Sequence, residues 1–442
     1  MTWGFPQICS VRLRSWLRSS PLNAAAWALT DQGLVSGANF LTTVLVARFL
    51  AVEEFGRFAI AWLVVLLIQN LHAAAIISPL MTIGTTWPEN DRPSYLGALL
   101  QQQLIFSVGA ALLVYSVSIA LSVAASNVDI AELALPIALI AAAVPVAELS
   151  RSICYSISHP REGFLLSAIR YSLQVIVLLI IFLWAPNRTD ARDVLLIAAA
   201  SAVVAGLVGA ARLPPVHWSK AALSQVARQH WRFCRWLLGA SALGNCRELI
   251  THVTVGAILS MADVGLLRAA QQLVFMINIP LQGLGRLATA YASDAYSRGG
   301  GPALYRVVRT FILPYMTMIT IILFSIVPLS DMLVHFMFGA AYADSAPLVS
   351  AFSLIMLLYL IRDVLFIVGR AVYQPSWEFI ALGMGAFASL PLLIPLLDRY
   401  GVFGALWAEA VFLATSLLTT AISAIAWRRR LRATISGGSQ RD

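Results

Sequence analysis

The sequence predicts an all-α membrane protein, a polytopic bundle of about twelve transmembrane helices in two six-helix repeats around a central cavity. First, 60% of the 442 residues are hydrophobic and 12% are charged, whereas soluble domains average roughly 45–50% apolar and about 25% charged residues. Second, apolar stretches of roughly 20 residues, long enough to cross a hydrocarbon core of about 30 Å, recur along the whole chain. Third, segments of the two halves repeat at a nearly constant offset.

Two other classes of protein are excluded by composition and pattern. An outer-membrane barrel needs segments of roughly 10 residues in which apolar and polar side chains alternate, and the chain has none. The net charge of +9 would suggest a nucleic-acid partner in a soluble protein, but the basic residues here lie mainly between apolar stretches and at the ends. We therefore expect a lipid bilayer as the surroundings and no nucleic acid.

The predicted spans follow the apolar stretches and end at proline, glycine and charged residues. The start of the first span is similar to a signal sequence, but the segment continues past Asp31 and Gln32 to Leu50, which predicts an uncleaved span. Connections such as 88–93 and 398–401 contain breaker residues, and none is long enough for a soluble domain. The spans are expected at 23–50, 57–82, 97–124, 131–156, 163–185, 193–212, 233–260, 264–288, 306–329, 346–370, 376–397 and 401–427.

The distribution of Lys and Arg predicts the orientation of the chain in the bacterial inner membrane. If the chain alternates sides at each span, twenty basic residues lie on one side. Only five lie on the other side, namely Arg48, Arg57, Arg188, Arg192 and Arg399. Because cytoplasmic loops are enriched in Lys and Arg, both termini are expected in the cytoplasm, which also requires an even number of spans.

The longest connection divides the chain into two comparable halves. Residues 43–58 (TVLVARFLAVEEFGRF) align with residues 252–267 (HVTVGAILSMADVGLL) at an offset of 209, which matches Gly56 with Gly265. Farther on, the offset becomes 215, where His159-Pro160 aligns with Gln374-Pro375. Repeated halves with the substrate path between them are a common transporter plan. The expected organisation is an N-terminal segment 1–22, a lobe 23–212, a cytoplasmic linker 213–232, a lobe 233–427 and a cytoplasmic tail 428–442.

Polar residues inside the predicted spans form stripes. The first helix of each half carries polar residues spaced four, three and four apart, so they share one helix face. These sets are Gln32, Ser36, Asn39 and Thr43, and, 209 residues later, Ser241, Asn245, Glu248 and His252. The second helices add Gln69, Asn70 and His72 in the first half, and Arg268, Gln271, Gln272, Asn278, Gln282 and Arg286 in the second. Because a charge at mid-bilayer costs roughly 2.5–3.5 kcal/mol, these stripes should face protein or water. A single Ser, Thr or Asn often only bonds between helices, but the duplicated stripes favour a hydrated cavity.

Several charged residues inside the spans are close in sequence. Two pairs of neighbours point about 100° apart on a helix, and we expect neither to be simply self-neutralising. These pairs are Arg247 with Glu248 and Arg362 with Asp363. Glu148 and Arg151, three residues apart on one face, are expected to form a structural ion pair.

No pattern in the chain predicts an enzyme, a metal site or a cofactor. The histidines within spans, His72 and His252, have no second His, Cys or carboxylate at metal-ligand spacing. The four cysteines lack paired metal spacing and are expected to be apolar fillers. No glycine-rich phosphate loop, nucleophile elbow or zincin motif occurs, and a glycosyltransferase or ligase would need a larger loop outside the membrane.

Short motifs near the span junctions resemble those of a known transporter family. They are Ala47-Arg48-Phe49-Leu50, Glu53-Glu54-Phe55-Gly56, Phe338-Gly339 with Tyr342, and Tyr400-Gly401-Val402-Phe403-Gly404-Ala405. The chain resembles polysaccharide flippases, the Wzx-like branch of the multidrug/oligosaccharidyl-lipid/polysaccharide exporter superfamily. The resemblance implies two six-helix lobes and a V-shaped cavity lined by spans one, two, seven and eight. The lipid II flippase branch, which has two further C-terminal spans, fits less well.

The resemblance also implies a function. We expect a transporter that flips a polyprenyl-pyrophosphate-linked oligosaccharide from the cytoplasmic to the periplasmic leaflet by alternating access, for exopolysaccharide or O-antigen synthesis. A glycan polymerase or chain-length regulator is a possible partner implied by that pathway. The alternative is a cation-coupled multidrug antiporter of the MATE type, in which Asp31, Glu248 and Glu409 would supply the intramembrane carboxylates.

The predicted site residues belong to the polar stripes. Arg binds phosphate oxygens with a planar fork, so Arg268 and Arg247 are the first predicted pyrophosphate ligands. Arg57 and Arg286 are expected near the two mouths of the cavity. Arg362 and Arg170 are expected to be structural. The predicted substrate-binding set is Arg268, Arg247, Gln32, Asn39, Asn245, Gln272, Asn278 and His72. Glu248, with Asp31 second, is the predicted ion-coupling residue, and the alternative for Glu248 is a permanent ion pair with an arginine of another helix.

Overall fold

The computed structural model describes residues 21–84, 87–124, 131–184, 189–276, 278–374 and 376–438. All regular elements within these ranges are helical, which confirms the predicted fold class. The first lobe contains α2 (Pro21–Phe49), α3 (Val52–His72), the π-helical η1 (Ala73–Ile77), α4 (Ser78–Thr82), η3 (Glu89–Asp91), α5 (Arg92–Ala124), α6 (Ala131–Ser156), α7 (Pro160–Trp184) and α8 (Ala191–Ala210). The second lobe contains α9 (Lys220–Ile258), α10 (Met261–Phe275), α11 (Asn278–Val307), the π-helical η4 (Val308–Ile312), α12 (Leu313–Met337), η5 (Ala340–Ser345), α13 (Ala346–Ala371), α14 (Ser376–Tyr400) and α15 (Val402–Gly438).

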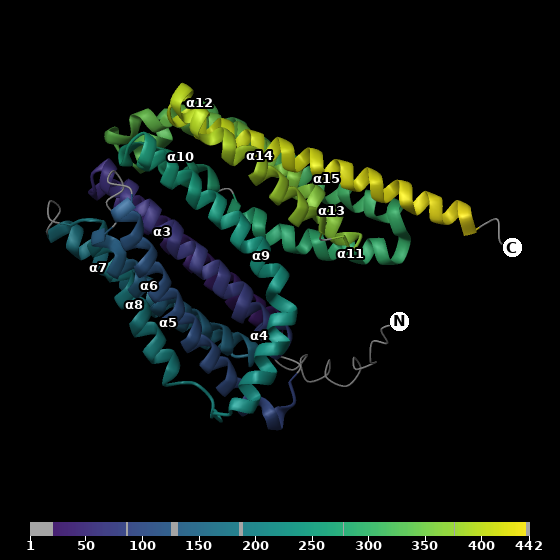
Figure 1. Ribbon diagram of the computed structural model, residues 1–442, viewed down its shortest axis with the longest axis horizontal. Coiled ribbons are helices and arrows are strands. Elements are labelled where there is room, and N and C mark those ends of the chain that lie inside the picture. Colours follow the sequence, from purple (N-terminus) through teal and green to yellow (C-terminus); the bar gives the residue numbers. More distant parts are fainter. Residues whose placement is uncertain are drawn as a thin grey trace.

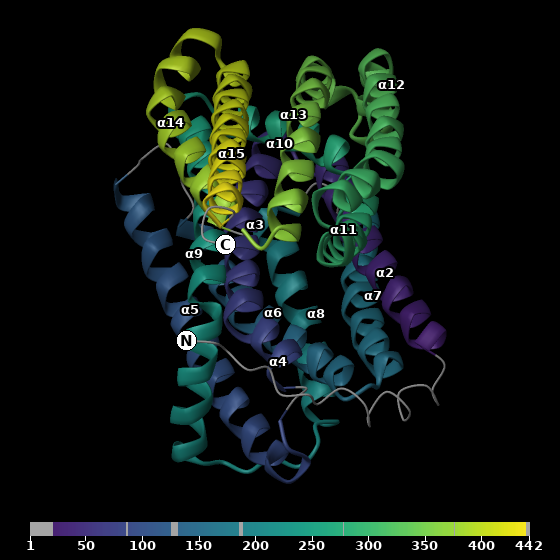
Figure 2. The same ribbon diagram turned by 90° about the vertical axis from the view of Figure 1, so that its right-hand side faces the viewer.

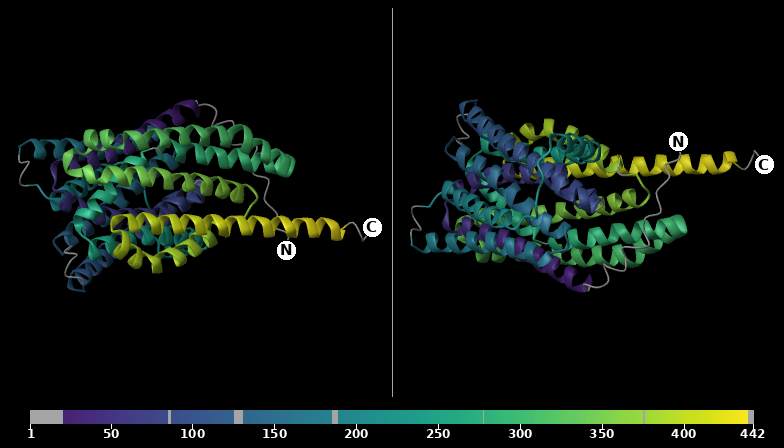
Figure 3. Two further views of the ribbon diagram at one scale, coloured as in Figure 1. Left: turned by 90° about the horizontal axis from the view of Figure 1, so that it is seen from above. Right: turned by 90° about the horizontal axis from the view of Figure 1, so that it is seen from below.

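The two lobes approach each other at one end of the molecule and diverge toward the other (Figure 1). Figures 2 and 3 show that the helices of both lobes run roughly along a common direction, and that the end of α15 extends beyond the other helices. We call the end at which α2 begins and α15 finishes the terminal end, and the opposite one the far end. This arrangement matters because the two lobes are in contact at one end and apart at the other.

The turns after α6 and α13 have the same structure, which supports the internal repeat. Ser158 and Tyr373 have positive φ angles of 64° and 59°, and no other non-glycine residue of the described ranges does. The two residues are 215 positions apart in the sequence. The hydrogen bonds also match: the amide of His159 donates to the carbonyl of Cys154 at 2.9 Å, and that of Gln374 to Gly369 at 2.8 Å. A left-handed residue followed by such a bond is the Schellman motif that ends helices.

The lobes are in direct contact at the far end. A Cβ atom on Gly56 of α3 would lie 1.9 Å from the carbonyl oxygen of Met261 in α10, and one on Gly265 would lie 2.5 Å from that of Val52. Glycine is therefore required at both positions for the two helix backbones to lie this close. Because Val52 and Met261 are also 209 residues apart, the contact has the symmetry of the repeat.

Side chains from several helices surround this glycine contact. Arg48 at the end of α2 donates to the carbonyl oxygens of Phe336 at 2.5 Å and Met337 at 3.0 Å, which are free at the C-terminus of α12. The rings of Phe55 and Tyr342, which are 0% and 1% exposed, form an edge-to-face pair with centroids 5.7 Å apart. The far end is thus closed by backbone, polar and aromatic contacts together.

Nine helical segments of the described residues are long and apolar enough to cross a membrane. They account for nine of the twelve expected spans. The other three are those expected at 23–50, 233–260 and 264–288, the segments that carry most of the polar stripes. Polar and charged residues lower the mean hydropathy of the first two, whereas in the third α10 has only 15 residues and ends before it reaches the length of a span.

Two expected boundaries differ from the structure. Helix α9 begins at Lys220, inside the expected linker, where Ser219 caps it by accepting from the amide of Ala222 at 3.3 Å. The prediction of one continuous helix over 264–288 was wrong, because α10 ends at Phe275 and α11 starts at Asn278.

Candidate functional site

A buried charge network lies in the second lobe between α9, α13 and α15. Arg247 donates from Nη1 and Nη2 to the two carboxylate oxygens of Glu409, at 2.7 and 3.1 Å, and its guanidinium stacks on Phe412 at 4.0 Å. The hydroxyl of Tyr359 donates to the same carboxylate. Arg247 and Glu409 have side chains that are only 9% and 8% exposed. Such a bidentate pair neutralises both charges and fixes α9 against α15.

A second ion pair connects α9 to α10. Arg268 donates from Nη1 to Glu248 at 3.1 Å, and Glu248 is 32% exposed whereas Arg268 is 10% exposed. Arg247 and Glu248 therefore have different partners, as expected for neighbours on different helix faces. The sequence analysis gave two alternatives for Glu248, an ion-coupling role or an ion pair with an arginine of another helix, and the Glu248–Arg268 pair is the second arrangement.

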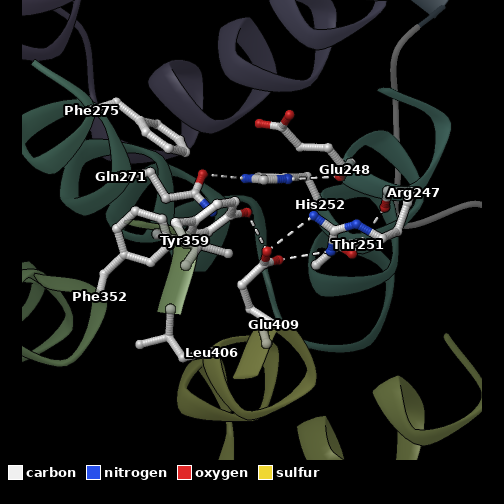
Figure 4. A pocket seen from close by; sticks show the side chains of 12 residues that line it. Arg247, Glu248, Thr251, His252, Gln271, Phe275, Phe352, Tyr359, Leu406 and Glu409 are labelled. Carbon is white, nitrogen blue, oxygen red and sulfur yellow. Dashed lines mark hydrogen bonds and ion pairs between the residues drawn. The ribbon is translucent and has the colours of Figure 1, made fainter. Parts of the chain in front are cut away.

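His252 of α9 forms a further contact between α9 and α10. Its Nδ1 lies 2.9 Å from the backbone carbonyl of Glu248, which can only accept, so this nitrogen carries a proton. Its Nε2 lies 2.9 Å from Oε1 of Gln271. In Figure 4, His252 lies between Glu248 and the Arg247–Glu409 pair.

Most of these side chains, Arg268 and Phe412 excepted, line a small internal cavity of about 30 Å³. Phe275 and Phe352 close it on one side (Figure 4). The volume has room for about two water molecules, and the polar lining offers them partners. The cavity is too small for a sugar or a phosphate, so it is an internal part of the lobe and not the substrate path.

The first lobe contains a corresponding network between α2 and α6. Arg151 donates to Asp31 at 2.6 Å and to both oxygens of Glu148, which confirms the predicted Glu148–Arg151 pair. The hydroxyl of Tyr155 also donates to Asp31 at 2.6 Å. Asp31 is 2% exposed, and its other oxygen, Oδ1, has no hydrogen-bond partner. One arginine thus pairs with two carboxylates, one from α2 and one from α6.

His72 lies in the same lobe and is buried. Its Nε2 is 2.6 Å from Oε1 of Gln103, whose amide nitrogen donates to Ser107 at 2.9 Å. The structure thus gives this predicted substrate ligand a partner within its own lobe.

The remaining predicted substrate residues occupy different environments. Asn245 accepts from the side-chain amide of Asn70 at 2.8 Å, a bond between α9 and α3 that joins the two lobes. Gln32 is exposed and donates to Ser36 at 3.2 Å, while Asn39 and Gln272 are half-buried. The side chains of Asn278, Gln282 and Arg286 lie outside the described residues.

Two other charged residues have local partners. The expectation that Arg362 and Asp363 do not neutralise each other was wrong, because Nη2 of Arg362 lies 2.9 Å from Asp363. The arginine side chain is long enough to fold back over one residue and also stacks on Tyr359 at 4.6 Å. Arg57 pairs with Glu54 at 3.2 Å.

Sequence reasoning missed the tyrosines of both networks. Tyr155 follows Glu148 and Arg151 on the same face of α6, and this spacing could have identified it. Tyr359 and Glu409 bond across 50 residues, and no local pattern indicates that contact.

Comparisons with known proteins agree on the fold. Residues 22–288 match the model of the family described as "Polysaccharide biosynthesis protein". No curated protein sequence matches the chain. Among solved structures, an inward-facing MATE-family multidrug resistance transporter has a TM-score of 0.70 at 13% identity, covering 91% of this chain and 95% of that one. The lipid II flippase MurJ, in an inward closed conformation, has a TM-score of 0.68 at 13% identity, covering 91% and 87%.

An outward-facing structure of a MATE-family transporter has a lower TM-score of 0.53, at 11% identity and with 93% of each chain covered. At these identities the likeness shows that the chain has the fold that these transporters share. The family model covers more than half of the sequence, and the apolar helices make the chain a multi-pass membrane protein. The chain therefore belongs to the polysaccharide biosynthesis protein family.

Proposed function

We propose that this protein is a flippase that moves a polyprenyl-pyrophosphate-linked oligosaccharide from the cytoplasmic to the periplasmic leaflet of the bacterial inner membrane. The terminal end is then cytoplasmic, in agreement with the excess of Lys and Arg assigned to that side. The substrate serves exopolysaccharide or O-antigen synthesis, and the protein acts as a transporter and not as an enzyme.

The observation that carries this proposal is the position of the segments with polar stripes, α2, α9 and α10, which are not among the nine long apolar helices of the described residues. Of these, α9 and α10 contact α3 across the boundary between the lobes, and α9 is bonded to α3 through Asn70 and Asn245. In a bilayer, such polar segments are stable only where they face protein or water. A polar path between the lobes, closed at the far end by the glycine contact, satisfies this requirement.

The same geometry supports alternating access. The far end is closed while the lobes diverge toward the terminal end, and the higher TM-score with the inward-facing transporter supports an inward-facing state. Outward release of the glycan requires the contact between α3 and α10 to separate. The lipid tail stays in the bilayer while the head group moves along the polar path.

Arg268 is the best-placed ligand for the pyrophosphate. It makes one hydrogen bond to Glu248, whereas Arg247 uses two nitrogens on Glu409. A guanidinium has five donors, so Arg268 keeps donors for phosphate oxygens. Protonation of Glu248 would weaken its hold on Arg268 and thereby couple proton movement to substrate binding.

A cation-coupled multidrug antiporter is the second candidate, because the superfamily fold includes MATE transporters. Its cation site would need a free carboxylate. Asp31, Glu248 and Glu409 all pair with arginines in this state, so none of the three is a free carboxylate.

Complementation tests the proposal in cells. In a strain from which this gene is deleted, wild type should restore glycan export, and Arg268→Ala should abolish export at unchanged membrane abundance. Arg298→Ala, which removes an exposed pair with Asp294, is the matched control and should export normally. Normal export by Arg268→Ala would remove Arg268 from the binding site, and a deletion strain with normal glycan export but greater drug sensitivity would favour the antiporter.

A further inference from the structure

The first turns of α9 carry a strong positive charge that no nearby residue in the sequence balances. No Asp or Glu occurs between Asp193 and Glu248. Six basic residues occur there, namely Arg212, Lys220, Arg228, Arg232, Arg235 and Arg247. The ion pairs of the described residues do not involve Arg228, Arg232 or Arg235.

This part of α9 is held firmly against the first lobe. Val226, His230 and Cys234, which recur every four residues, are 0%, 3% and 3% exposed. His230 contacts Gln102 of α5 through Nδ1 at 2.9 Å, and Tyr95 through Nε2 at 3.2 Å. The guanidinium groups on the other faces are therefore presented by a fixed helix.

The segment before α9 is fixed as well. The amide of His217 donates to the carbonyl of Pro93 at 3.0 Å. A Cβ on Gly97 would lie 2.1 Å from the carbonyl oxygen of His217, so the two backbones are in direct contact. A site built on this segment needs little ordering when a ligand binds.

Two adjoining open crevices lie beside the exposed face of α9. One has a volume of about 600 Å³ and is bounded by Trp87 and Asp91 of the connection between α4 and α5. The other has a volume of about 330 Å³ and includes Arg228. Both are lined by Gln225, Gln229 and Arg232. Together they combine two guanidinium groups, two amides, one carboxylate and an aromatic wall, so the basic groups outnumber the acidic one.

Aromatic side chains indicate the depth of this surface. Trp218, Trp231 and Trp236 are 62%, 61% and 66% exposed, although tryptophan is usually mostly buried. Exposed tryptophans gather at the level of lipid head groups, where the ring faces the acyl chains and the N–H faces water. Trp231, one residue before Arg232, therefore indicates that this part of α9 lies near the level of the head groups.

We propose that Arg228, Arg232, Gln225 and Gln229 form a docking site for the diphosphate head group of a prenyl lipid in the cytoplasmic leaflet, which captures the substrate before it enters the path between the lobes. The proposal rests on the proposed function for the identity of the lipid. A diphosphate has more charge and more acceptor oxygens than a phosphodiester, so it can use two arginines that are one helical turn apart. Trp87 offers an apolar surface to the first part of the lipid chain.

Direct binding tests the site without requiring transport. The full-length chain is reconstituted in phosphatidylcholine nanodiscs, and binding of farnesyl diphosphate is measured by isothermal titration calorimetry, with farnesol as the uncharged probe. Wild type should bind farnesyl diphosphate and not farnesol. Arg228→Gln with Arg232→Gln should weaken binding at least tenfold, because each charge-assisted hydrogen bond contributes more than a neutral one.

Arg235→Gln is the matched control, since it removes the same charge from the same helix at a position that stacks on Trp236 and does not line the crevices. It should bind as wild type does, and Arg228→Lys with Arg232→Lys should be intermediate because the charges remain. No binding by wild type, or equal weakening by Arg235→Gln, would overturn the site. Equal competition by phosphatidylglycerol nanodiscs would overturn the choice of a diphosphate. If farnesyl diphosphate binds as expected but no glycan lipid is flipped, the proposed function fails while this site stands.

Discussion

Gly56 and Gly265 occupy equivalent positions in the two repeats and lie against each other at the far end of the molecule. Each lacks the Cβ that would collide with the opposite helix, at 1.9 Å in one direction and 2.5 Å in the other. The obstructing atoms are backbone carbonyl oxygens, which cannot move aside as a side chain can. The closed far end therefore depends on both glycines, and any larger residue must separate α3 from α10.

Gly56→Ala is expected to shift the protein toward an open far end. Overpacking of a tight contact typically costs about 1–3 kcal/mol, enough to change the populations of two states severalfold or more. Spin labels on Glu53 and Asp344, both exposed near this end, report the separation of the lobes by electron resonance in a cysteine-free background. Gly109→Ala, where the new methyl group meets nothing within 4 Å, is the control. Identical distance distributions for Gly56→Ala and wild type would refute the role of the contact.

Arg247 and Glu409 are expected to be strongly coupled in stability. Removing one partner of a buried ion pair leaves an uncompensated charge and typically costs about 3–5 kcal/mol, whereas replacing both by apolar residues is often nearly neutral. Arg247→Met and Glu409→Met should each lower the thermal unfolding temperature in detergent, and the double variant should regain most of the loss. Additive losses would show that the two side chains act independently.

Glu248→Gln separates a coupling role from a structural one. Glutamine keeps the shape of Glu248 and an acceptor for Arg268, but it cannot change its protonation state. If Glu248 couples transport to protons, the variant should transport at a rate that does not respond to an imposed proton gradient. Asp294→Asn, at an exposed carboxylate, should keep the wild-type response. Full gradient dependence in Glu248→Gln would leave Glu248 only as the partner of Arg268.

His230 makes the docking of the first turns of α9 sensitive to acid. Burial lowers the pKa of His230 from 6.5 to about 4. The unfolded chain therefore binds more protons than the folded one between these values, so stability falls as the pH decreases from about 6.5 toward 4. His230→Gln keeps a hydrogen-bonding side chain without titrating and should show a smaller loss over this range. Equal acid sensitivity in thermal unfolding of both proteins would assign the effect to other groups.

The repeat and the helix faces could be predicted because they depend on local spacing. The 209-residue offset paired Gly56 with Gly265, and the 215-residue offset located the turns at Ser158 and Tyr373, since equivalent segments fold into equivalent turns. The partners of the charged residues could not be predicted in this way. Arg247 and Glu409 are 162 residues apart, and only the packing of α9 against α15 brings them together.

The break between α10 and α11 was also not predicted from the sequence. Residues 264–288 show a continuous helical pattern of polar and apolar residues, with Pro280 as the one strong interruption. The structure ends α10 at Phe275, five residues before that proline. At this point Phe275 packs against Phe352 of α13, with ring centroids 5.3 Å apart. Because Phe352 is distant in the sequence, no local pattern indicates this contact.

Reconstituted transport tests the central claim most directly. The purified protein is placed in proteoliposomes with a fluorescent polyprenyl-diphosphate oligosaccharide, and the fraction of sugar accessible to an external glycosidase is followed over time. Wild type should make nearly all of the lipid-linked glycan accessible, whereas protein-free vesicles should expose only the outer leaflet, and Arg268→Ala should behave like the protein-free vesicles. Accessibility that never rises above the protein-free level, or transfer of sugar to an acceptor without exchange between leaflets, would contradict the flippase mechanism.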